Sequence, residues 1–299
     1  MYLWGIDLGG TKIEVAVLRD NDTLDEVLRK RIPTEGDGGF DHIIRRIHAL
    51  VDMAAAELGA RPERIGMGTP GTTDPITGLM KNSNTVCLNG TTFHKRVQEV
   101  LGIPVAIAND ANCFALAEAK FGAGKKYPDA RVVFGVILGT GVGGGVVVDG
   151  KILQGRHGIG GEWGHILLDE DGDPCYCGKS GCVETVISGP ALQRYYFRQT
   201  GIKRLLPEIV ERHLNGTDPA ATQTILRLTH QFGKGIAQVI NIIDPDVIVL
   251  GGGVGNIAAL YTDGAAAVKN WIFNDRCDTH FERPLLGDSA GVIGAALLV

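Results

Sequence analysis

The sequence predicts an α/β fold organised as two lobes. The chain has 299 residues, which exceeds one compact core when domains average roughly 150 residues. Residues 3–18 and 132–148 each show a strand, a glycine-rich turn and a second strand. Predicted helices and buried strands follow both hairpins. The two hairpins therefore look like the starts of duplicated α/β halves.

The first half is expected to contain a long helix, two short strands and a second helix. Apolar side chains recur at helical spacing between residues 39 and 58. Short apolar runs at 64–68 and 105–108 predict strands. The alanine-rich stretch 112–121 predicts the second helix, which begins close behind the second of these strands.

The second half is expected to contain a long helix, a buried strand and a closing helix. The long helix covers 219–243 and stops at Asp244-Pro245, because proline cannot continue a helix. Residues 246–250 predict a buried strand that runs into glycines 251–253, and residues 289–298 predict a helix that returns to the first lobe. The predicted domains are a small lobe, 1–120 completed by 289–299, and a large lobe, 121–288.

Composition narrows the class of protein and of partner. With 44% hydrophobic residues, 21% charged residues and a net charge of −5, the chain is typical of globular proteins and unlike a nucleic-acid-binding surface. Its apolar stretches are interrupted well short of the ~20 residues that a membrane span needs, and no signal peptide is visible. Cys175 and Cys177 are too close together to staple a loop, so we expect a reduced, cytoplasmic environment.

Three glycine-rich loops, after Ile6, Leu138 and Leu250, predict a nucleotide site. Glycine lets backbone N–H groups approach phosphate oxygens, and Thr11 or Thr140 adds a hydroxyl donor. One such loop would more simply be a tight turn, but three favour a nucleotide.

Asp7 stands beside the first loop and is a candidate ligand of Mg²⁺ through water, since magnesium prefers oxygen ligands and keeps much of its hydration shell. The predicted cofactor-binding positions are Gly5, Asp7, Gly9, Gly10, Thr11, Lys12, Gly139, Thr140, Gly141, Val142, Gly143, Gly144, Gly145, Gly252 and Gly253.

Two motifs imitate other nucleotide-binding patterns. The Gly139-x-Gly141-x-x-Gly144 pattern fits a dinucleotide fingerprint, but that loop must open a helix, and this one opens a strand at 146–148. Gly178-Lys179-Ser180 imitates the end of a Walker A loop, yet Asp173 stands where the first glycine is required. We therefore reject both interpretations.

A zinc site is predicted between residues 165 and 182. Three cysteines lie close together with a histidine just upstream, which fits one tetrahedral zinc held by sulfur and imidazole. The predicted ligands are His165, Cys175, Cys177 and Cys182. Four protein ligands leave no open position for water, so the zinc is expected to be structural and not catalytic.

Two carboxylates flank the predicted zinc ligands. Glu162 and Glu184 are not needed for the metal, and carboxylate oxygens are good acceptors for a hydroxyl-rich ligand. One imidazole nitrogen of His165 can bind zinc while the other donates to an oxygen of such a ligand. We therefore predict that Glu162, His165 and Glu184 contact substrate.

Together these residues resemble the ROK family of sugar kinases, whose zinc motif pairs a histidine with C-x-C-G-x-x-G-C-x-E. Every position of that pattern is present between Cys175 and Glu184. The resemblance runs from Asp7-Leu8-Gly9-Gly10-Thr11-Lys12 to Gly287-Asp288-Ser289-Ala290-Gly291. It implies a two-lobed, actin- and hexokinase-like (ribonuclease H-like) ATPase fold with a zinc knuckle, and it implies ATP, Mg²⁺ and structural Zn²⁺ as cofactors.

The catalytic candidate is Asp110. Taken alone, Asp110 or Asn109 would more simply cap a helix. Residues 108–119, however, resemble the family motif that carries the catalytic aspartate, so the resemblance makes Asp110 the general base and places Asn109 on a neighbouring sugar hydroxyl. Other sugar-side positions of the family match Gly71, Thr72 and Asn84.

Two segments, 81–90 and 175–185, look most like the fructokinase and mannokinase branch of the family. This implies phosphorylation of the 6-hydroxyl of a hexose, first of all fructose, with mannose and glucose as further candidates. N-acetylhexosamine kinases share the same motifs and form the alternative.

A different class is a non-catalytic sugar sensor or regulator. Repressors of the family carry a helix-turn-helix domain ahead of the first phosphate loop, and we expect none here because Asp7 lies almost at the N-terminus. Since Asp110 and the glycine loops are intact, we also expect turnover. The family further implies a homodimer.

Overall fold

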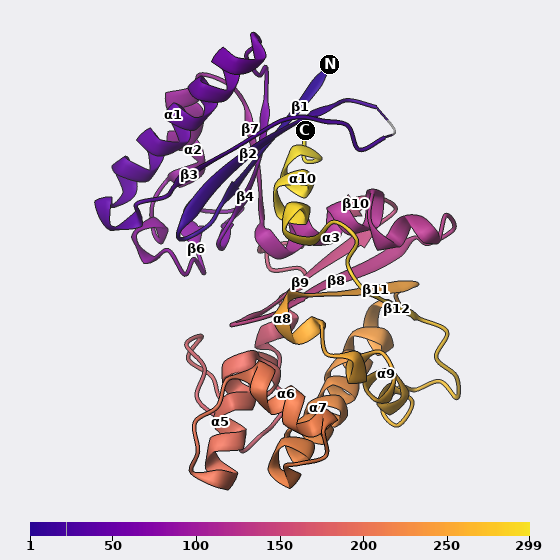
Figure 1. The fold of residues 1–299 in the computed structure, drawn as a ribbon. Helices are drawn as coiled ribbons and strands as arrows, with labels where there is room; N and C mark the ends of the chain where they lie inside the picture. The colour runs from indigo at the N-terminus through magenta and orange to yellow at the C-terminus, as the bar shows by residue number, and fades with distance from the viewer. Residues whose placement is uncertain (22) are drawn as a thin grey trace. The chain divides into compact units, whose positions relative to one another are not determined.

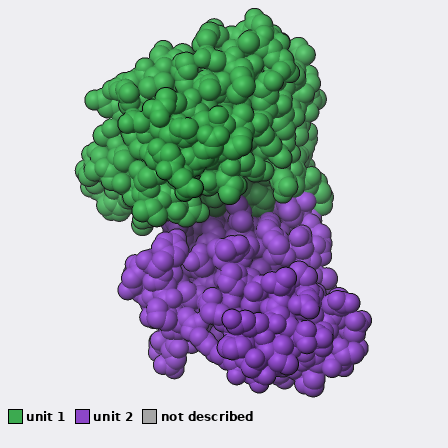
Figure 2. All heavy atoms as spheres, turned by 60° about the vertical axis from the view of Figure 1, so that its left-hand side comes forward, with its two compact units in different colours: residues 1–126, 145–160, 285–299 green, residues 127–144, 161–284 purple. Residues whose placement is uncertain are grey.

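The protein is described from a computed structural model that covers residues 1–21 and 23–299. The described chain divides into two compact units, which Figure 2 colours separately. The first unit comprises residues 1–126, 145–160 and 285–299, and the second comprises residues 127–144 and 161–284. The predicted division into two domains with a boundary near residue 120 stays a prediction. The compact units differ from the predicted lobes mainly because residues 145–160 belong to the first unit.

A five-stranded sheet of order β3-β2-β1-β4-β7 forms the centre of the first unit. The strands β3, β2 and β1 pair antiparallel, whereas β1, β4 and β7 run parallel. Because the parallel strands share one direction, their carboxyl ends lie at the same edge of the sheet. The strands are β1 Tyr2–Leu8, β2 Lys12–Arg19, β3 Glu26–Pro33, β4 Ile65–Thr69 and β7 Val105–Asn109, with a separate hairpin of β5 Thr72–Thr73 and β6 Met80–Lys81.

Helices cover both faces of this sheet (Figure 1). The helices α1 and α2 pack on one face, and α3 and α10 pack on the other. The α-helices are α1 Phe40–Leu58, α2 Phe93–Leu101, α3 Asp110–Lys120 and α10 Ala290–Ala296. Short 3₁₀ helices cover Gly36–Gly38, Val86–Leu88, Ala123–Lys126 and Gly287–Ser289.

The two faces of β1 pack against different helices, because side chains alternate along a strand. Trp4, Ile6 and Leu8 are buried in the core that includes α1. Gly5 faces α10, where a Cβ would lie 2.3 Å from the carbonyl oxygen of Val292. Close packing of α10 therefore explains this glycine, and a nucleotide contact at Gly5 stays a prediction.

The second sheet has the order β10-β9-β8-β11-β12. Its strands are β8 Val132–Leu138, β9 Val142–Val148, β10 Lys151–Ile152, β11 Val247–Gly251 and β12 His280–Glu282. The strand β11 pairs in parallel with β8 and β12. The glycine loop at 139–141 joins β8 directly to β9, as the sequence predicts, so this loop does not open a helix.

The second unit also contains the zinc-ligand region and most of the helical chain. Its helices are α4 Val183–Ile187, α5 Gly189–Thr200, α6 Leu206–Leu214, α7 Pro219–Ile243, α8 Gly252–Gly255 and α9 Asp263–Val268, with 3₁₀ helices at Trp163–His165 and Ala258–Leu260. The long helix α7 has the predicted bounds. Its N-cap Asp218 accepts hydrogen bonds from two backbone N–H groups, and it ends at Asp244 in a left-handed conformation. The predicted glycine loop after β11 instead forms the short helix α8.

Among residues 1–21 and 23–299, no helix combines the length and the apolar character that crossing a membrane requires.

Candidate active site and zinc centre

Asp7 and Asp110 lie at the carboxyl ends of two parallel strands in the first unit. Asp7 is near the end of β1, and Asp110 begins α3 directly after β7. The strand β4 runs between β1 and β7 and contributes Gly68, the register partner of Asp7. A Cβ at Gly68 would lie 3.3 Å from Cys113 Sγ and 3.5 Å from Asp7 Oδ1, so β4 passes directly beside the carboxylate.

The two carboxylates influence each other's charge. Burial, and after it the negative charges of Asp110 and Glu14, raise the pKa of Asp7 to about 6 against the opposing effects of Lys12 and Arg31. Desolvation also raises the pKa of Asp110, although its side chain reaches solvent, and the N–H of Ala111, which donates to Oδ1 at 2.8 Å, opposes that shift. Neighbouring carboxylates with raised pKa values fit a hard cation such as Mg²⁺, which would relieve their repulsion.

Asn109 has a structural role beside the catalytic candidate. Its side-chain oxygen accepts a hydrogen bond from the N–H of Asn112 at 2.7 Å and so caps α3. The cap is therefore Asn109, and Asp110 is the first helical residue. The sugar contact of Asn109 stays a prediction.

Replacing Asp7 with asparagine is expected to stabilise the metal-free protein by about 3 kcal/mol at pH 8. The folded-state pKa of about 6 lies above the usual 3.8, so the folded state binds this proton more tightly than the unfolded state. Stability is therefore lost as pH rises from about 4 to about 6, and the cost is complete above that range. Urea unfolding at pH 4 and pH 8 should show the gain only at pH 8.

The exposed Asp129 supplies a control, because Asp129→Asn should change the unfolding free energy little at either pH. An Asp7→Asn protein that is less stable than the wild type at pH 8 would show that the Asp7 charge is favourable in the fold.

The first glycine loop is a tight turn tied to a neighbouring strand end. The N–H of Gly9 donates to the carbonyl oxygen of Lys12 at 2.9 Å. The hydroxyl of Thr34 donates to the carbonyl oxygen of Gly9 at 2.7 Å, and the N–H of Thr34 donates to the carbonyl oxygen of Thr11 at 3.0 Å. Gly10, Thr11 and Lys12 are exposed at the tip.

A cavity of about 830 Å³ opens in the second unit. Gly139 and Thr140 of the second glycine loop line it together with Gly253 of the third, so two loops that are far apart in the sequence meet at one cavity. Its size is in the range of small-molecule sites. The remaining wall, which sequence reasoning did not find, comes mainly from α5 and α6 and the chain after α8: Gly189, Pro190, Gln193, Leu206, Pro207, Val210, Glu211, His213, Leu214, Asn215, Val254, Asn256, Ile257, Ala258 and Ala259.

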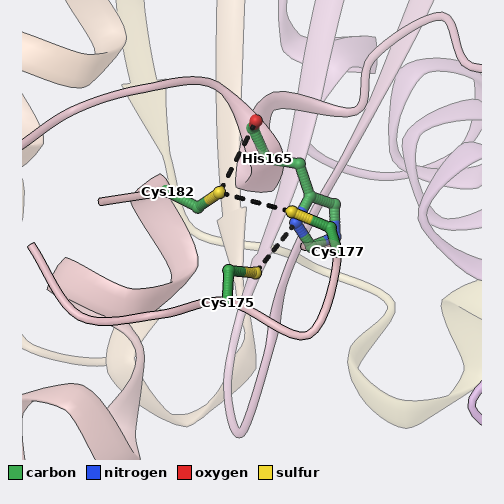
Figure 3. A group of neighbouring side chains, drawn as sticks. All are labelled: His165, Cys175, Cys177 and Cys182. Carbon is green, nitrogen blue, oxygen red and sulfur yellow. Dashed lines mark hydrogen bonds between the residues drawn. The ribbon is translucent and has the colours of Figure 1, made fainter. Parts of the chain in front are cut away.

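Figure 3 shows the four predicted zinc ligands pointing toward one another. His165 ends a 3₁₀ turn that Trp163 anchors, since its indole N–H donates to the carbonyl oxygen of Gly235 at 3.0 Å. An antiparallel bridge between Leu167 and Cys182 brings the last cysteine back to this turn. All four ligand atoms lie within 4.8 Å of one another.

The spacing of these atoms fits a tetrahedral ion. Cys175 Sγ lies 3.5 Å from His165 Nδ1, and the Sγ atoms of Cys177 and Cys182 are 3.6 Å apart. Tetrahedral zinc with ordinary bond lengths gives about 3.6 Å between sulfur and nitrogen and about 3.8 Å between two sulfurs. Burial and the neighbouring thiols raise the pKa of Cys182 to about 12, so a cation is needed to hold this side chain as a thiolate at neutral pH.

The second nitrogen of His165 has a partner that the sequence analysis missed. Nε2 lies 2.9 Å from the hydroxyl of Tyr176, and the two rings meet edge to face at 5.1 Å. We predicted that this nitrogen donates to a sugar oxygen; here it pairs with Tyr176, and the sugar contact of His165 stays a prediction. The contact could not be predicted from the Cys-x-Cys motif, because the spacing of the cysteines does not determine the orientation of the side chain between them.

Glu184 also contacts something other than the predicted partner. Its Oε2 accepts a hydrogen bond from the N–H of Val142, at the end of the second glycine loop, at 2.9 Å. The N–H of Val142, which we predicted to face phosphate, is therefore engaged by this carboxylate. A sugar contact of Glu184 stays a prediction, as does that of Glu162, which directly precedes the turn that carries His165.

Several predicted positions have clear packing reasons for their residue type. A Cβ at Gly144 would lie 2.5 Å from the carbonyl oxygen of Gly161, and one at Gly71, where φ is +95°, would lie 2.5 Å from that of Lys81. The other predicted sugar-side residues are half-buried Thr72 and exposed Asn84. Ligand contacts at these positions stay predictions.

Comparison with known proteins identifies the relatives of this chain. The model of the ROK family matches residues 3–299. An N-acetyl-D-glucosamine kinase from Erwinia tasmaniensis is 35% identical over 308 residues, which cover 99% of this chain and 98% of that protein. A ROK hexokinase from Thermus thermophilus has a TM-score of 0.86 at 33% identity, with 100% of this chain and 98% of that chain covered.

A ROK family glucokinase from Streptomyces griseus, solved in complex with glucose and AMPPNP, has a TM-score of 0.77 at 28% identity, with coverage of 100% and 99%. These structures confirm the predicted α/β sugar-kinase fold, and the cysteine and histidine cluster fits its zinc knuckle. Since the family match spans almost the entire sequence, the chain belongs to the ROK family.

Proposed function

We propose that this protein is an ATP-dependent sugar kinase that phosphorylates the 6-hydroxyl of N-acetyl-D-glucosamine. The predicted preference for fructose rests on the resemblance of two segments alone. The Erwinia relative, which aligns over nearly its full length, is named for the acetamido sugar and favours the alternative. We therefore place N-acetyl-D-glucosamine ahead of fructose, mannose and glucose.

The cavity of the second unit is the observation that carries the proposal. Gly139, Thr140 and Gly253 were predicted as nucleotide contacts from sequence alone, and all three line it. Backbone N–H groups of glycine loops and a threonine hydroxyl suit phosphate oxygens, while the apolar wall from α6 and the chain after α8 suits a purine. The resemblance to a glucokinase that holds AMPPNP supports the same assignment.

In the proposed reaction, ionised Asp110 accepts the proton of the sugar 6-hydroxyl as its oxygen attacks the γ-phosphorus of ATP. The bond from that phosphorus to the bridging oxygen breaks, and ADP leaves. Asn109, Glu162 and Glu184 orient the sugar through its other hydroxyls. Asp7 would hold magnesium through water, and the ion would neutralise charge on the phosphates; His165 and the three cysteines would hold zinc, which would make the knuckle rigid. The homodimer implied by the family stays a prediction.

The test is ADP release from MgATP with five sugars: N-acetyl-D-glucosamine, N-acetylmannosamine, fructose, mannose and glucose. We expect the highest kcat/KM with N-acetyl-D-glucosamine, by about tenfold or more, because a site that pairs the acetamido group leaves buried polar atoms unpaired with the other sugars. Highest turnover with fructose would restore the fructokinase assignment. Absence of sugar-dependent ADP release from zinc-loaded protein would favour the sensor class.

A further inference from the structure

The chain that follows the zinc ligands holds both ends of the second glycine loop. Glu184 Oε2 accepts a hydrogen bond from the N–H of Val142 at 2.9 Å. The N–H of Gly189 donates to the carbonyl oxygen of Gly139, also at 2.9 Å. Glu184 lies in α4 and Gly189 opens α5, so both bonds come from one short stretch of chain. The loop from Gly139 to Val142 is thus fastened at its start and at its end.

The sequence of the loop is adapted to this carboxylate. A Cβ at Gly141 would lie 2.7 Å from Glu184 Oε2, which is closer than a carbon and an oxygen can approach without displacement. Gly141 is not among the residues with positive φ, so its backbone conformation does not require glycine. A larger residue at 141 would therefore displace the end of the Glu184 side chain, which glycine leaves in place.

We propose that Glu184 is a positioning residue of the phosphate loop and that it links the zinc knuckle to the nucleotide site. This inference rests on the proposed kinase function, because it assigns the loop to phosphate. The zinc ligand Cys182 occupies the N-cap position of α4. A metal bound to it would therefore fix the start of the helix that carries Glu184. This role concerns Glu184 Oε2 and the loop, and it is additional to the sugar contact proposed for the same carboxylate.

The test is the affinity for MgAMPPNP, measured by titration calorimetry without sugar on the zinc-loaded, full-length protein. Glu184→Ala removes the acceptor and should raise the Kd about tenfold, the effect of one hydrogen bond to a charged group. Glu184→Gln keeps an acceptor oxygen and should stay within about threefold of the wild type. Glu162→Ala is the matched control: it should weaken sugar binding and leave the nucleotide Kd within about twofold.

Gly141→Ala tests the same contact from the loop side, without any change in the zinc region. It should weaken MgAMPPNP binding in the wild-type background and have little further effect when combined with Glu184→Ala, because the carboxylate that it displaces is then absent. This cycle keeps the inference testable even if Glu184→Ala folds poorly.

The outcomes separate this inference from the proposed function. Wild-type protein that binds no MgAMPPNP would overturn the kinase proposal, and the inference with it. Normal wild-type binding with an equal or tighter affinity in Glu184→Ala would overturn the inference alone. Additive effects of Gly141→Ala and Glu184→Ala would also contradict it, because independent sites do not share one contact.

Discussion

Asp110→Asn is expected to lower kcat by about 10²–10⁴, the usual contribution of a general base. The amide cannot accept the proton of the attacking hydroxyl, but it keeps the shape of the side chain and an oxygen for the N–H of Ala111. The Kd values of sugar and MgAMPPNP should therefore change little. Single-turnover kinetics with MgATP and calorimetric binding would separate the chemical step from binding.

The pH profile provides a second criterion for the same variant. The pKa of Asp110 is raised by desolvation, and the base must be ionised, so wild-type kcat should fall as pH drops through that raised pKa. The residual activity of Asp110→Asn should lack this acid limb. Asp129→Asn, which alters an exposed carboxylate, should keep both the rate and the limb. A kcat within tenfold of the wild type in Asp110→Asn would remove this residue from the role of base.

The parts of the site that could be predicted are those in which the chemistry is local in sequence. His165, Cys175, Cys177 and Cys182 lie within 18 positions of one another, so a metal that prefers sulfur and nitrogen accounts for all four at once. The two hairpins likewise give a period-2 pattern with glycines at the turn. In both cases the residues that interact are close in the chain, and the fold adds only their exact geometry.

The missed contacts are those that depend on how separate segments pack. The approach of Asp7 to Asp110 follows from the strand order β1-β4-β7, which no single segment encodes. The bond from Glu184 to Val142 joins residues 42 positions apart. Gly141 leaves space for the Glu184 carboxylate in this hydrogen bond, but in the sequence it cannot be distinguished from the other glycines of the loop.

Several elements were missed because they are short or show a weak alternation of apolar residues. In the edge strand β3 only Leu28 is fully buried, while Val27 and Ile32 are partly buried against the core, so the strand shows no clear alternation. In α2 only Phe93 and Val97 are buried. The short helix α8 is a different case, since its glycines have poor helix propensity and predict a loop. In α8 the packing of the chain after β11 outweighs the poor helix propensity of glycine.

Loss of zinc is expected to impair the sugar site and the nucleotide site together. Cys182→Ser should bind little zinc, because the remaining ligands no longer complete the tetrahedron of sulfur and nitrogen. Cys182 is buried and caps α4, so the knuckle and the start of α4 would lose their common anchor. We expect kcat/KM for the sugar to fall about 10–100-fold or more. Zinc content per chain and steady-state kinetics would measure both quantities.

The affinity of zinc-free protein for MgAMPPNP shows whether the zinc knuckle supports the nucleotide site as well as the sugar site. If zinc fixes Glu184, and Glu184 fixes Val142, then zinc-free protein should also bind MgAMPPNP more weakly in the absence of sugar. A scaffold that served the sugar alone would leave that affinity unchanged. Cys277→Ser, at a half-buried thiol outside the cluster, should keep zinc, sugar turnover and nucleotide affinity. Unchanged far-ultraviolet circular dichroism would exclude global unfolding as the cause of a coupled loss.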